Sequence, residues 1–239
     1  MIKNIQTYGD RALLVNFEQK IDAEVNEEVI ALNEWILAER LQGLTYTVPA
    51  YCSLTLAYDP GLIELEVLME KIAAFSQSQK EEKKREKRLL RIPVCYEESF
   101  APDKEEVLRQ TGLAWEEILN LHTQTRFRVF MLGFLPGFTY MGKLPQALFC
   151  QRRKEPRLRV PKSSVGLAGF QTGIYPSVAP GGWQLIGKTP LEIFDPGRQD
   201  PFLFKAGDEL HFYQIDVADF ESIEKEVERK SFDYESLIQ

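Results

Sequence analysis

Residues 76–88 read SQSQKEEKKREKR and divide the sequence, because no apolar side chain occurs among them. Between Lys80 and Arg88, six basic and three acidic side chains follow one another. Such a segment cannot be buried in a hydrophobic core, so it is either the solvated end of the preceding helix or a flexible tether. Both alternatives predict two domains, residues 1–88 and residues 89–239.

The first domain alternates between strand and helix patterns. Residues 12–17 form a short apolar run typical of a strand, and residues 44–61 contain two β-rich runs followed by a turn. Residues 22–41 carry apolar side chains at helical spacing behind Asp22, whose carboxylate suits an N-cap, and residues 62–75 are again amphipathic. We therefore expect an α+β domain in which helices cover a small sheet.

The second domain consists mainly of short β-prone runs separated by glycine and proline. An apolar strand pattern at residues 89–96 is followed by two short helix patterns, at residues 102–111 and 115–122. Further β-prone runs, among them RFRVFMLGF, SSVGLAGF and ELHFYQI, continue to Ile215. This spacing is typical of a β-barrel or sandwich, and an acidic amphipathic helix is expected after Asp216.

The composition excludes several classes of partner. A formal net charge of −7 repels phosphate, so we expect neither a nucleic acid nor a membrane surface as partner. The first residues lack an apolar run of signal-peptide length, and no stretch approaches the roughly 18 apolar residues of a membrane span. We therefore expect a cytoplasmic protein with reduced thiols.

The cysteines and histidines do not predict a metal site. The three cysteines lie far apart without C-x-x-C spacing, and the only histidines are His122 and His211. Neighbouring residues therefore cannot supply a zinc ligand set, and no metal is predicted.

Residues 182–189 read GWQLIGKT and match the P-loop pattern G-x-x-x-x-G-K-[ST]. A P-loop needs a strand before it, a tight loop and a helix after it. Here a turn precedes the stretch, and its four inner residues favour extended backbone. Pro190 and a second turn soon after leave no room for a helix. We therefore interpret the stretch as a strand, paired in a hairpin with residues 191–194 (LEIF).

Several longer motifs resemble one known family. FMLGFLPGFTYMG, RVPKSSVGLAGFQTGIYP and PGGWQLIGKTP, followed by FDPG and KAGDELHF, are similar to the KipI family, also called allophanate hydrolase subunit 1-like. YGDRALLVNF, VPAYCSLTLAYDP and IPVCYEESFAPD extend the resemblance to nearly the whole chain. Members of this family include the B subunit of the bacterial ATP-dependent 5-oxoprolinase.

The resemblance implies an α+β N-terminal domain followed by a cyclophilin-like β-barrel domain. It also implies two partners, a KipA-like C subunit and an A subunit, in a complex that opens 5-oxo-L-proline to L-glutamate while ATP is hydrolysed. Because GWQLIGKT is not a credible nucleotide motif, we expect ATP to be bound by a partner or at a composite site.

Other functions stay open at this point. The family also includes inhibitors that bind a sporulation histidine kinase, and the sequence alone does not separate that role from the enzymatic one. The allophanate name points to urea-processing relatives, although the chain carries no biotin-carrier pattern. Peptidyl-prolyl isomerisation is disfavoured, because a fold does not transfer its function.

Candidate site residues lie in two segments. Residues 152–164 gather six basic residues and one acid, and we expect Lys162, Ser163 and Ser164 to contact an anion, although a solvated loop would look the same. In GFQTGIYP, Gln171, Thr172 and Tyr175 offer an amide, a hydroxyl and a phenol for a carboxylate or lactam.

The remaining candidates are single residues. Trp183, with the aromatic side chains of GFLPGFTY, could line a pocket or serve as a core plug. His122 ends a predicted helix, where the macrodipole favours its cation, and it is a candidate acid or base or else a structural histidine. The candidate catalytic residues are His122 and Lys162.

Overall fold

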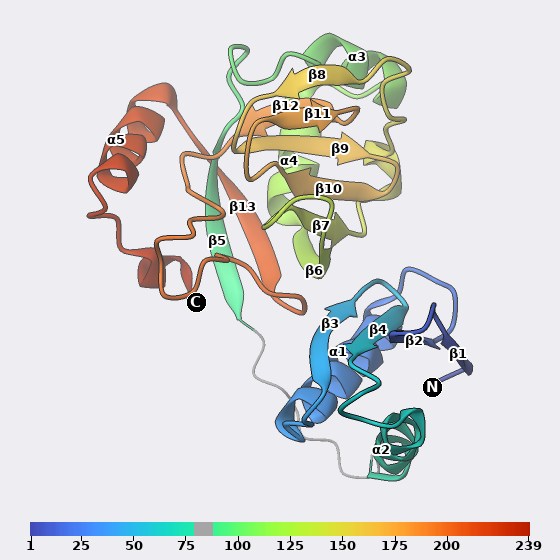
Figure 1. Cartoon of the computed structure of the whole chain (residues 1–239). Helices are drawn as coiled ribbons and strands as arrows, with labels where there is room; N and C mark the ends of the chain where they lie inside the picture. The colour runs from blue at the N-terminus through green and yellow to red at the C-terminus, as the bar shows by residue number, and fades with distance from the viewer. Residues whose placement is uncertain (79–87) are drawn as a thin grey trace. The chain divides into compact units, whose positions relative to one another are not determined.

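A computed structural model describes residues 1–78 and 88–239, and Figure 1 shows its elements. The chain falls into two compact units, Met1–Glu86 and Lys87–Gln239. Most of the charged segment, for which we expected a helix end or a tether, lies outside the described residues. Arg88 belongs to the second unit, where its guanidinium pairs with Asp208 and its carbonyl accepts from Glu209 N at 2.9 Å.

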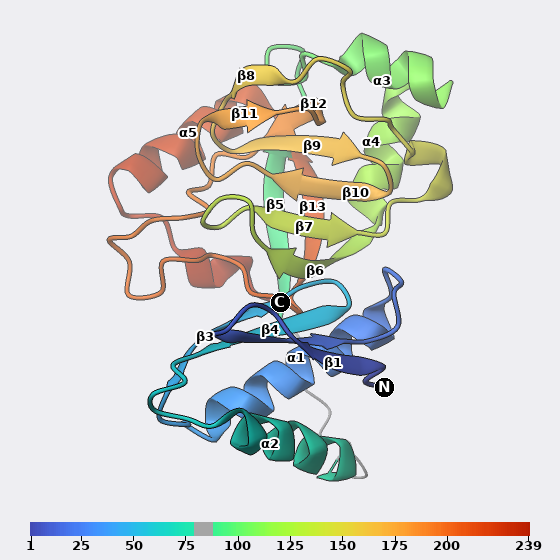
Figure 2. The same cartoon turned by 45° about the vertical axis from the view of Figure 1, so that its right-hand side comes forward.

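Unit 1 contains a four-stranded antiparallel sheet in the order β1-β2-β4-β3, with two helices on one face (Figure 2). Leu13 of β2 pairs with Leu56 of β4, and both side chains are buried under the helices. The elements are β1 (Asn4–Thr7), β2 (Ala12–Asn16), α1 (Ala23–Ala38), β3 (Leu44–Pro49), β4 (Ser53–Tyr58) and α2 (Leu65–Ser78).

The start of α1 follows from its sequence. The Asp22 carboxylate accepts hydrogen bonds from Glu24 N at 3.0 Å and Val25 N at 3.4 Å, which satisfies amides that the helix itself cannot pair. Val29 and Leu32 of the predicted apolar stripe are fully buried against the sheet. The predicted N-cap and helix are confirmed.

Unit 2 is built on a closed seven-stranded barrel in the order β10-β7-β6-β13-β5-β12-β9. β5 and β13 pair in parallel, while the other neighbouring strands are antiparallel. The barrel strands are β5 (Leu89–Cys95), β6 (Arg126–Leu132), β7 (Thr139–Gly142), β9 (Ser164–Ala168), β10 (Gln171–Ile174), β12 (Gln184–Lys188) and β13 (Glu209–Ile215). The expected barrel within a mixed α/β fold is confirmed.

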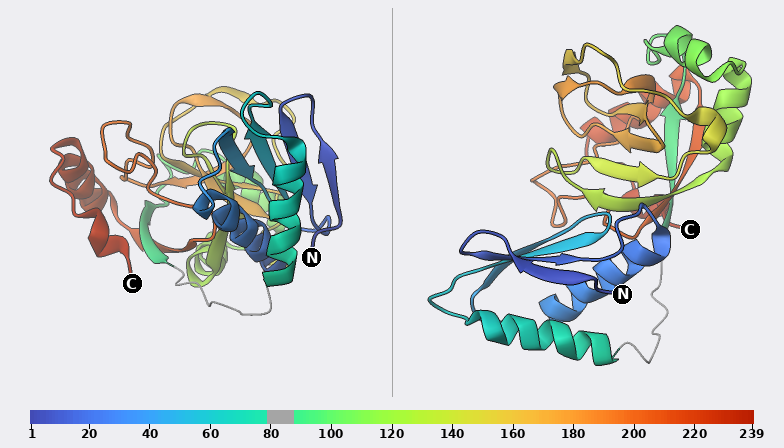
Figure 3. Two further views of the ribbon diagram at one scale, coloured as in Figure 1. Left: turned by 60° about the horizontal axis from the view of Figure 1, so that its bottom comes forward. Right: turned by 90° about the vertical axis from the view of Figure 1, so that its right-hand side faces the viewer.

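Helices and a small sheet surround this barrel. α4 packs against β13, as the right-hand view of Figure 3 shows, and the pair β8–β11 covers another side of the wall. These elements are α3 (Lys104–Thr111), α4 (Trp115–Gln124), β8 (Arg157–Val160), β11 (Ala179–Gly181), α5 (Val217–Glu228) and two short 3-10 helices, η1 (Gln146–Leu148) and η2 (Tyr234–Leu237). No helix within the described ranges has both the length and the apolar character needed to cross a membrane.

The barrel wall separates two apolar clusters. Side chains such as Met141 and Leu167 fill its interior. On the outside, Phe138, Trp183 and Leu185 pack together between the wall and the β8–β11 pair. Because side chains alternate along a strand, neighbouring residues of β7 and of β9 belong to different clusters: Tyr140 and Ala168 contact the outer one, Met141 and Leu167 the inner one.

GWQLIGKT forms β12 and no helix follows it, so its interpretation as a strand is confirmed. The predicted hairpin with residues 191–194 is wrong. Both edges of β12 are already occupied, by β9 and by β5, so no edge is left for a third strand. Leu191 and Ile193 are instead buried in the core, and the carbonyl of Ile193 accepts from Leu203 N at 3.0 Å.

Candidate functional site

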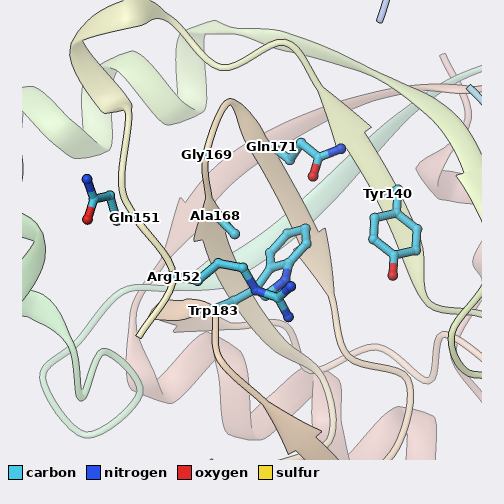
Figure 4. Close-up of a pocket in the computed structure, with 7 residues that line it drawn as sticks. All are labelled: Tyr140, Gln151, Arg152, Ala168, Gly169, Gln171 and Trp183. Atoms are coloured by element: carbon cyan, nitrogen blue, oxygen red, sulfur yellow. The ribbon is translucent and has the colours of Figure 1, made fainter. Parts of the chain in front are cut away.

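A pocket of about 360 Å³ opens on the outer face of the barrel in unit 2 (Figure 4). Its volume is in the range of small-molecule sites. The residues that line it are Tyr140, Gln151, Arg152, Ala168, Gly169, Gln171 and Trp183. We call this hollow the outer-face pocket.

Glycines in the wall make room for the indole at its centre. A Cβ atom at Gly173 would lie 2.9 Å from the Trp183 ring, and one at Gly166 would lie 3.1 Å from its Cβ. Either contact would push the indole outward. Trp183 is only 4% exposed and packs edge-to-face on Phe138 with 5.4 Å between ring centroids. The pocket therefore has a rigid aromatic wall.

A buried carboxylate organises the chain beside this wall. Asp103 is 3% exposed, and its Oδ1 accepts from Arg153 Nη1 at 2.7 Å and Arg157 Nη2 at 2.6 Å. Its Oδ2 accepts from Leu185 N at 2.7 Å. Charge-assisted bonds of this kind fix both guanidinium groups. We call this arrangement the Asp103 clamp.

The clamp changes the interpretation of the basic segment 152–164. Six basic residues gather there, but Arg153 and Arg157 share the carboxylate of Asp103, and Lys162 is paired with Glu192. Arg152 differs, because it is exposed and no carboxylate of the described residues forms a salt bridge with it. The segment therefore offers the outer-face pocket one uncompensated guanidinium.

Polar groups surround the indole on three sides. In Figure 4 the Arg152 side chain reaches across Trp183, Gln171 and Tyr140 stand on the strands beside it, and Gln151 turns away. Burial raises the pKa of Tyr140, and the positive charge of Arg152 opposes part of that rise. The Tyr140 phenol is therefore a neutral hydrogen-bonding group at ordinary pH.

The structure does not bring all predicted site residues together. Gln171 and Trp183 line the outer-face pocket, whereas Lys162 and Ser163 line a second pocket of about 690 Å³ beside α5 and η2. The hydroxyls of Ser163 and Ser164 donate to backbone carbonyls, at 2.9 Å and 2.8 Å. Tyr175 is buried with its ring against Gly181 and belongs to the outer apolar cluster.

His122 and Thr172 lie in the barrel interior. His122 Nδ1 is 2.8 Å from the Tyr96 hydroxyl, its Nε2 is 3.1 Å from Thr172 Oγ1, and Thr172 donates to the Gly166 carbonyl at 3.1 Å. This order of donors requires a proton on Nε2 and none on Nδ1. Burial lowers the pKa of His122 to about 3. The macrodipole argument for a cationic His122 therefore fails, because loss of hydration outweighs the attraction of the helix end.

Neither His122 nor Lys162 lines the outer-face pocket, so the catalytic roles of these two residues stay predictions. Sequence reasoning missed Asp103 and Arg152. Asp103 lies 50 residues from Arg153 in the chain, and nothing in the sequence shows that they meet. Without that contact, Arg152 cannot be distinguished from the arginines beside it. Among residues 1–78 and 88–239, no group of three His, Cys, Asp or Glu side chains is placed to hold a metal ion.

Residues 3–204 match the family described as carboxyltransferase domain, subdomain C and D. A relative from Bacillus subtilis (strain 168), named as the B subunit of 5-oxoprolinase, is 36% identical over 93% of this chain and 97% of its own length. The protein of that name from Escherichia coli O157:H7 is 36% identical over 85% of this chain and 92% of its own length. The chain therefore belongs to the carboxyltransferase subdomain C and D family, and these two relatives are named as B subunits of 5-oxoprolinase. The resemblance to the allophanate hydrolase subunit 1-like family is confirmed.

Solved structures contain the same fold as part of longer chains. The crystal structure of TTHA0988 in space group P212121 matches with a TM-score of 0.78 and 35% identity, over 86% of this chain and 40% of that chain. That of the K. lactis urea amidolyase matches with a TM-score of 0.76 and 18% identity, over 98% of this chain and 16% of that chain. This chain thus spans less than half of either protein.

Proposed function

We propose that this chain is the B subunit of an ATP-dependent 5-oxoprolinase complex, which opens 5-oxo-L-proline to L-glutamate. The observation that supports this most strongly is the 36% identity to the B. subtilis relative over nearly the full length of both chains. The names of the B. subtilis and E. coli relatives give no support to the kinase-inhibitor alternative.

The reaction explains why a complex is needed. An unstrained amide is a poor electrophile, and transfer of the ATP γ-phosphoryl group to its oxygen, with release of ADP, makes its carbon reactive. A first water then adds to that carbon, and the carbon–nitrogen bond breaks with protonation of the nitrogen to leave an acyl phosphate. A second water hydrolyses the acyl phosphate to the carboxylate and free phosphate. The stretch that matches the full P-loop pattern forms strand β12, and ATP is therefore bound by a partner or at a composite site. The partners are a KipA-like C subunit and an A subunit.

The proposal assigns the outer-face pocket to the substrate. Gln171 supplies an amide for the lactam, and Trp183 supplies the apolar wall for its ring. His122 acts at a distance, because it holds Thr172, the neighbour of Gln171 on β10, and touches no solvent. Lys162 and Ser163 face the second pocket, and an anion that binds there has to compete with Glu192 for Lys162.

The proposal also includes finer structural statements. The barrel is cyclophilin-like, unit 1 is an independent α+β domain, and the boundary lies near Arg88. The protein works in the cytoplasm. The closed barrel and the two compact units support the statements on the barrel and the domains.

A deletion strain distinguishes this function from urea processing. A strain that lacks the gene for this chain is fed 5-oxo-L-proline or urea as nitrogen source, and glutamate formation and urea consumption are measured. We expect 5-oxo-L-proline to accumulate and urea consumption to be unchanged. Loss of urea consumption with normal glutamate formation would contradict the proposal.

A further inference from the structure

We propose that Arg152 binds the carboxylate of the substrate and so restricts the outer-face pocket to cyclic amides that carry a carboxylate. This inference rests on the proposed function, because it concerns the substrate of that same site. It starts from the different positions of three of the four arginines in the basic segment 152–164, namely Arg152, Arg153 and Arg157.

The backbone on both sides of Arg152 is fixed at the pocket. The carbonyl of Gln151 accepts from Gln184 Nε2 at 2.9 Å, and Arg153 N donates to the Gly182 carbonyl at 2.7 Å. Gln184 and Gly182 flank Trp183, so these bonds hold Arg152 beside the indole. The ion pair of Arg153 with Asp103 adds a side-chain anchor one residue further.

Arg152 keeps its charge available. The Asp103 clamp uses Arg153 and Arg157, and no carboxylate among the described residues forms a salt bridge with Arg152. A guanidinium group binds a carboxylate through two parallel hydrogen bonds, a geometry that lysine cannot reproduce. On a chain with a net charge of −7, an uncompensated cation at a pocket is the feature that attracts a small anion.

The rest of the pocket suits the ring that carries this carboxylate. Trp183 and Tyr140 offer aromatic surface, and the Gln171 amide lies on the neighbouring strand. In the second pocket two of the three lining lysines, Lys162 and Lys188, are paired with Glu192 and Glu224. Of the described residues, Arg152 is the one lysine or arginine that lines the outer-face pocket, and it is therefore the specificity-determining cation of that pocket.

Steady-state kinetics of the reconstituted complex of A, B and C subunits tests this inference. We expect Arg152→Gln to raise KM for 5-oxo-L-proline about tenfold or more and to change kcat less. The reason is the loss of one charge-assisted bidentate contact with the substrate carboxylate. Arg152→Lys should recover only part of the affinity. Lys154→Gln is the matched control, since it removes one exposed positive charge two residues away and should change KM less than twofold.

The carboxylate-free ring 2-pyrrolidinone provides the second measurement. Its inhibition constant should be the same for the wild-type complex and the Arg152→Gln complex, because it has no group for Arg152 to bind. An unchanged KM in Arg152→Gln, or an equal loss of affinity for both rings, would overturn the assignment and leave the proposed function intact. Glutamate formation at the same rate without this chain would refute the proposed function and the assignment with it.

Discussion

At the scale of single residues, the interior of the barrel depends on a neutral histidine. Tyr96, His122 and Thr172 form one directed chain of hydrogen bonds, and His122 is stacked on Phe212 with 4.6 Å between ring centroids. A proton on Nδ1 would remove the acceptor of the Tyr96 hydroxyl and place a charge among apolar rings. The hydrogen bonds and the apolar surroundings therefore favour the neutral imidazole of His122 over its protonated form.

These hydrogen bonds of His122 predict that unit 2 loses stability in acid. The pKa of His122 is about 3 in the folded state and near 6.5 when unfolded, so between these values the unfolded state binds the extra proton. The contribution of neutral His122 to the free energy of unfolding is therefore fully present above pH 6.5. Below that pH the free energy of unfolding falls, by at most about 1.4 kcal/mol per pH unit. Urea unfolding of His122→Gln should show a smaller pH slope than wild type. His211→Gln, which removes the other histidine, is the matched control. An unchanged pH slope in His122→Gln would contradict the prediction.

The Asp103 clamp predicts a large effect from a single carboxylate. Asp103→Asn leaves Arg153 and Arg157 without their partner, and we expect the free energy of unfolding to fall by about 2 to 3 kcal/mol. This value takes account of the partial exposure of both arginine side chains, 33% and 22%. Glu221→Gln is the control, because its pair with Lys225 is longer, at 3.9 Å, and more than half exposed. Equal effects of the two substitutions in urea unfolding would show that the clamp contributes nothing.

At the scale of elements, the two glycines of GWQLIGKT have different environments. A Cβ atom at Gly187 would lie 2.8 Å from Val94 Cγ1 and 2.9 Å from the Cys95 carbonyl, both on β5. At Gly182 the nearest atoms would be 3.7 Å away. We expect Gly187→Ala to lower the free energy of unfolding by about 1 to 3 kcal/mol and Gly182→Ala to leave it nearly unchanged. Thermal unfolding of both variants measures the difference, and equal losses would contradict the packing of β12 on β5.

Local patterns predicted the elements well where the signal and the structure were both local. Asp22 caps α1 through amides two and three residues away, and the apolar run of residues 12–17 became β2 (Ala12–Asn16). LEIF has an equally good strand pattern but finds both edges of β12 occupied, and an edge is a property of the whole barrel.

Only part of the candidate site was predicted, because some of its residues stand out locally and others depend on distant contacts. Gln171 and Trp183 stand out in Gly-rich motifs, and both line the outer-face pocket. Arg152 becomes distinct only when Asp103 binds Arg153 and Arg157, at separations of 50 and 54 residues. A contact over that distance leaves no periodic or spacing signal in the sequence.

At the scale of the whole molecule, the contacts of Arg88 bear on where the second domain begins. Its guanidinium pairs with Asp208, and its carbonyl accepts from Glu209 N, beside the parallel pairing of β5 with β13. We expect a fragment of residues 87–239 to fold and to have a higher Tm than one of residues 89–239. Differential scanning calorimetry measures both. Equal Tm values would place the boundary at Arg88 or later.

The central claim is that this chain is a working part of a lactam-opening ATPase, and the coupling of the two reactions tests it most directly. Glutamate and ADP are quantified in mixtures of the A and C subunits, ATP and 5-oxo-L-proline, with and without this chain. We predict one glutamate for each ADP when the chain is present, and no glutamate when it is omitted. Equal glutamate formation in both mixtures would contradict the claim.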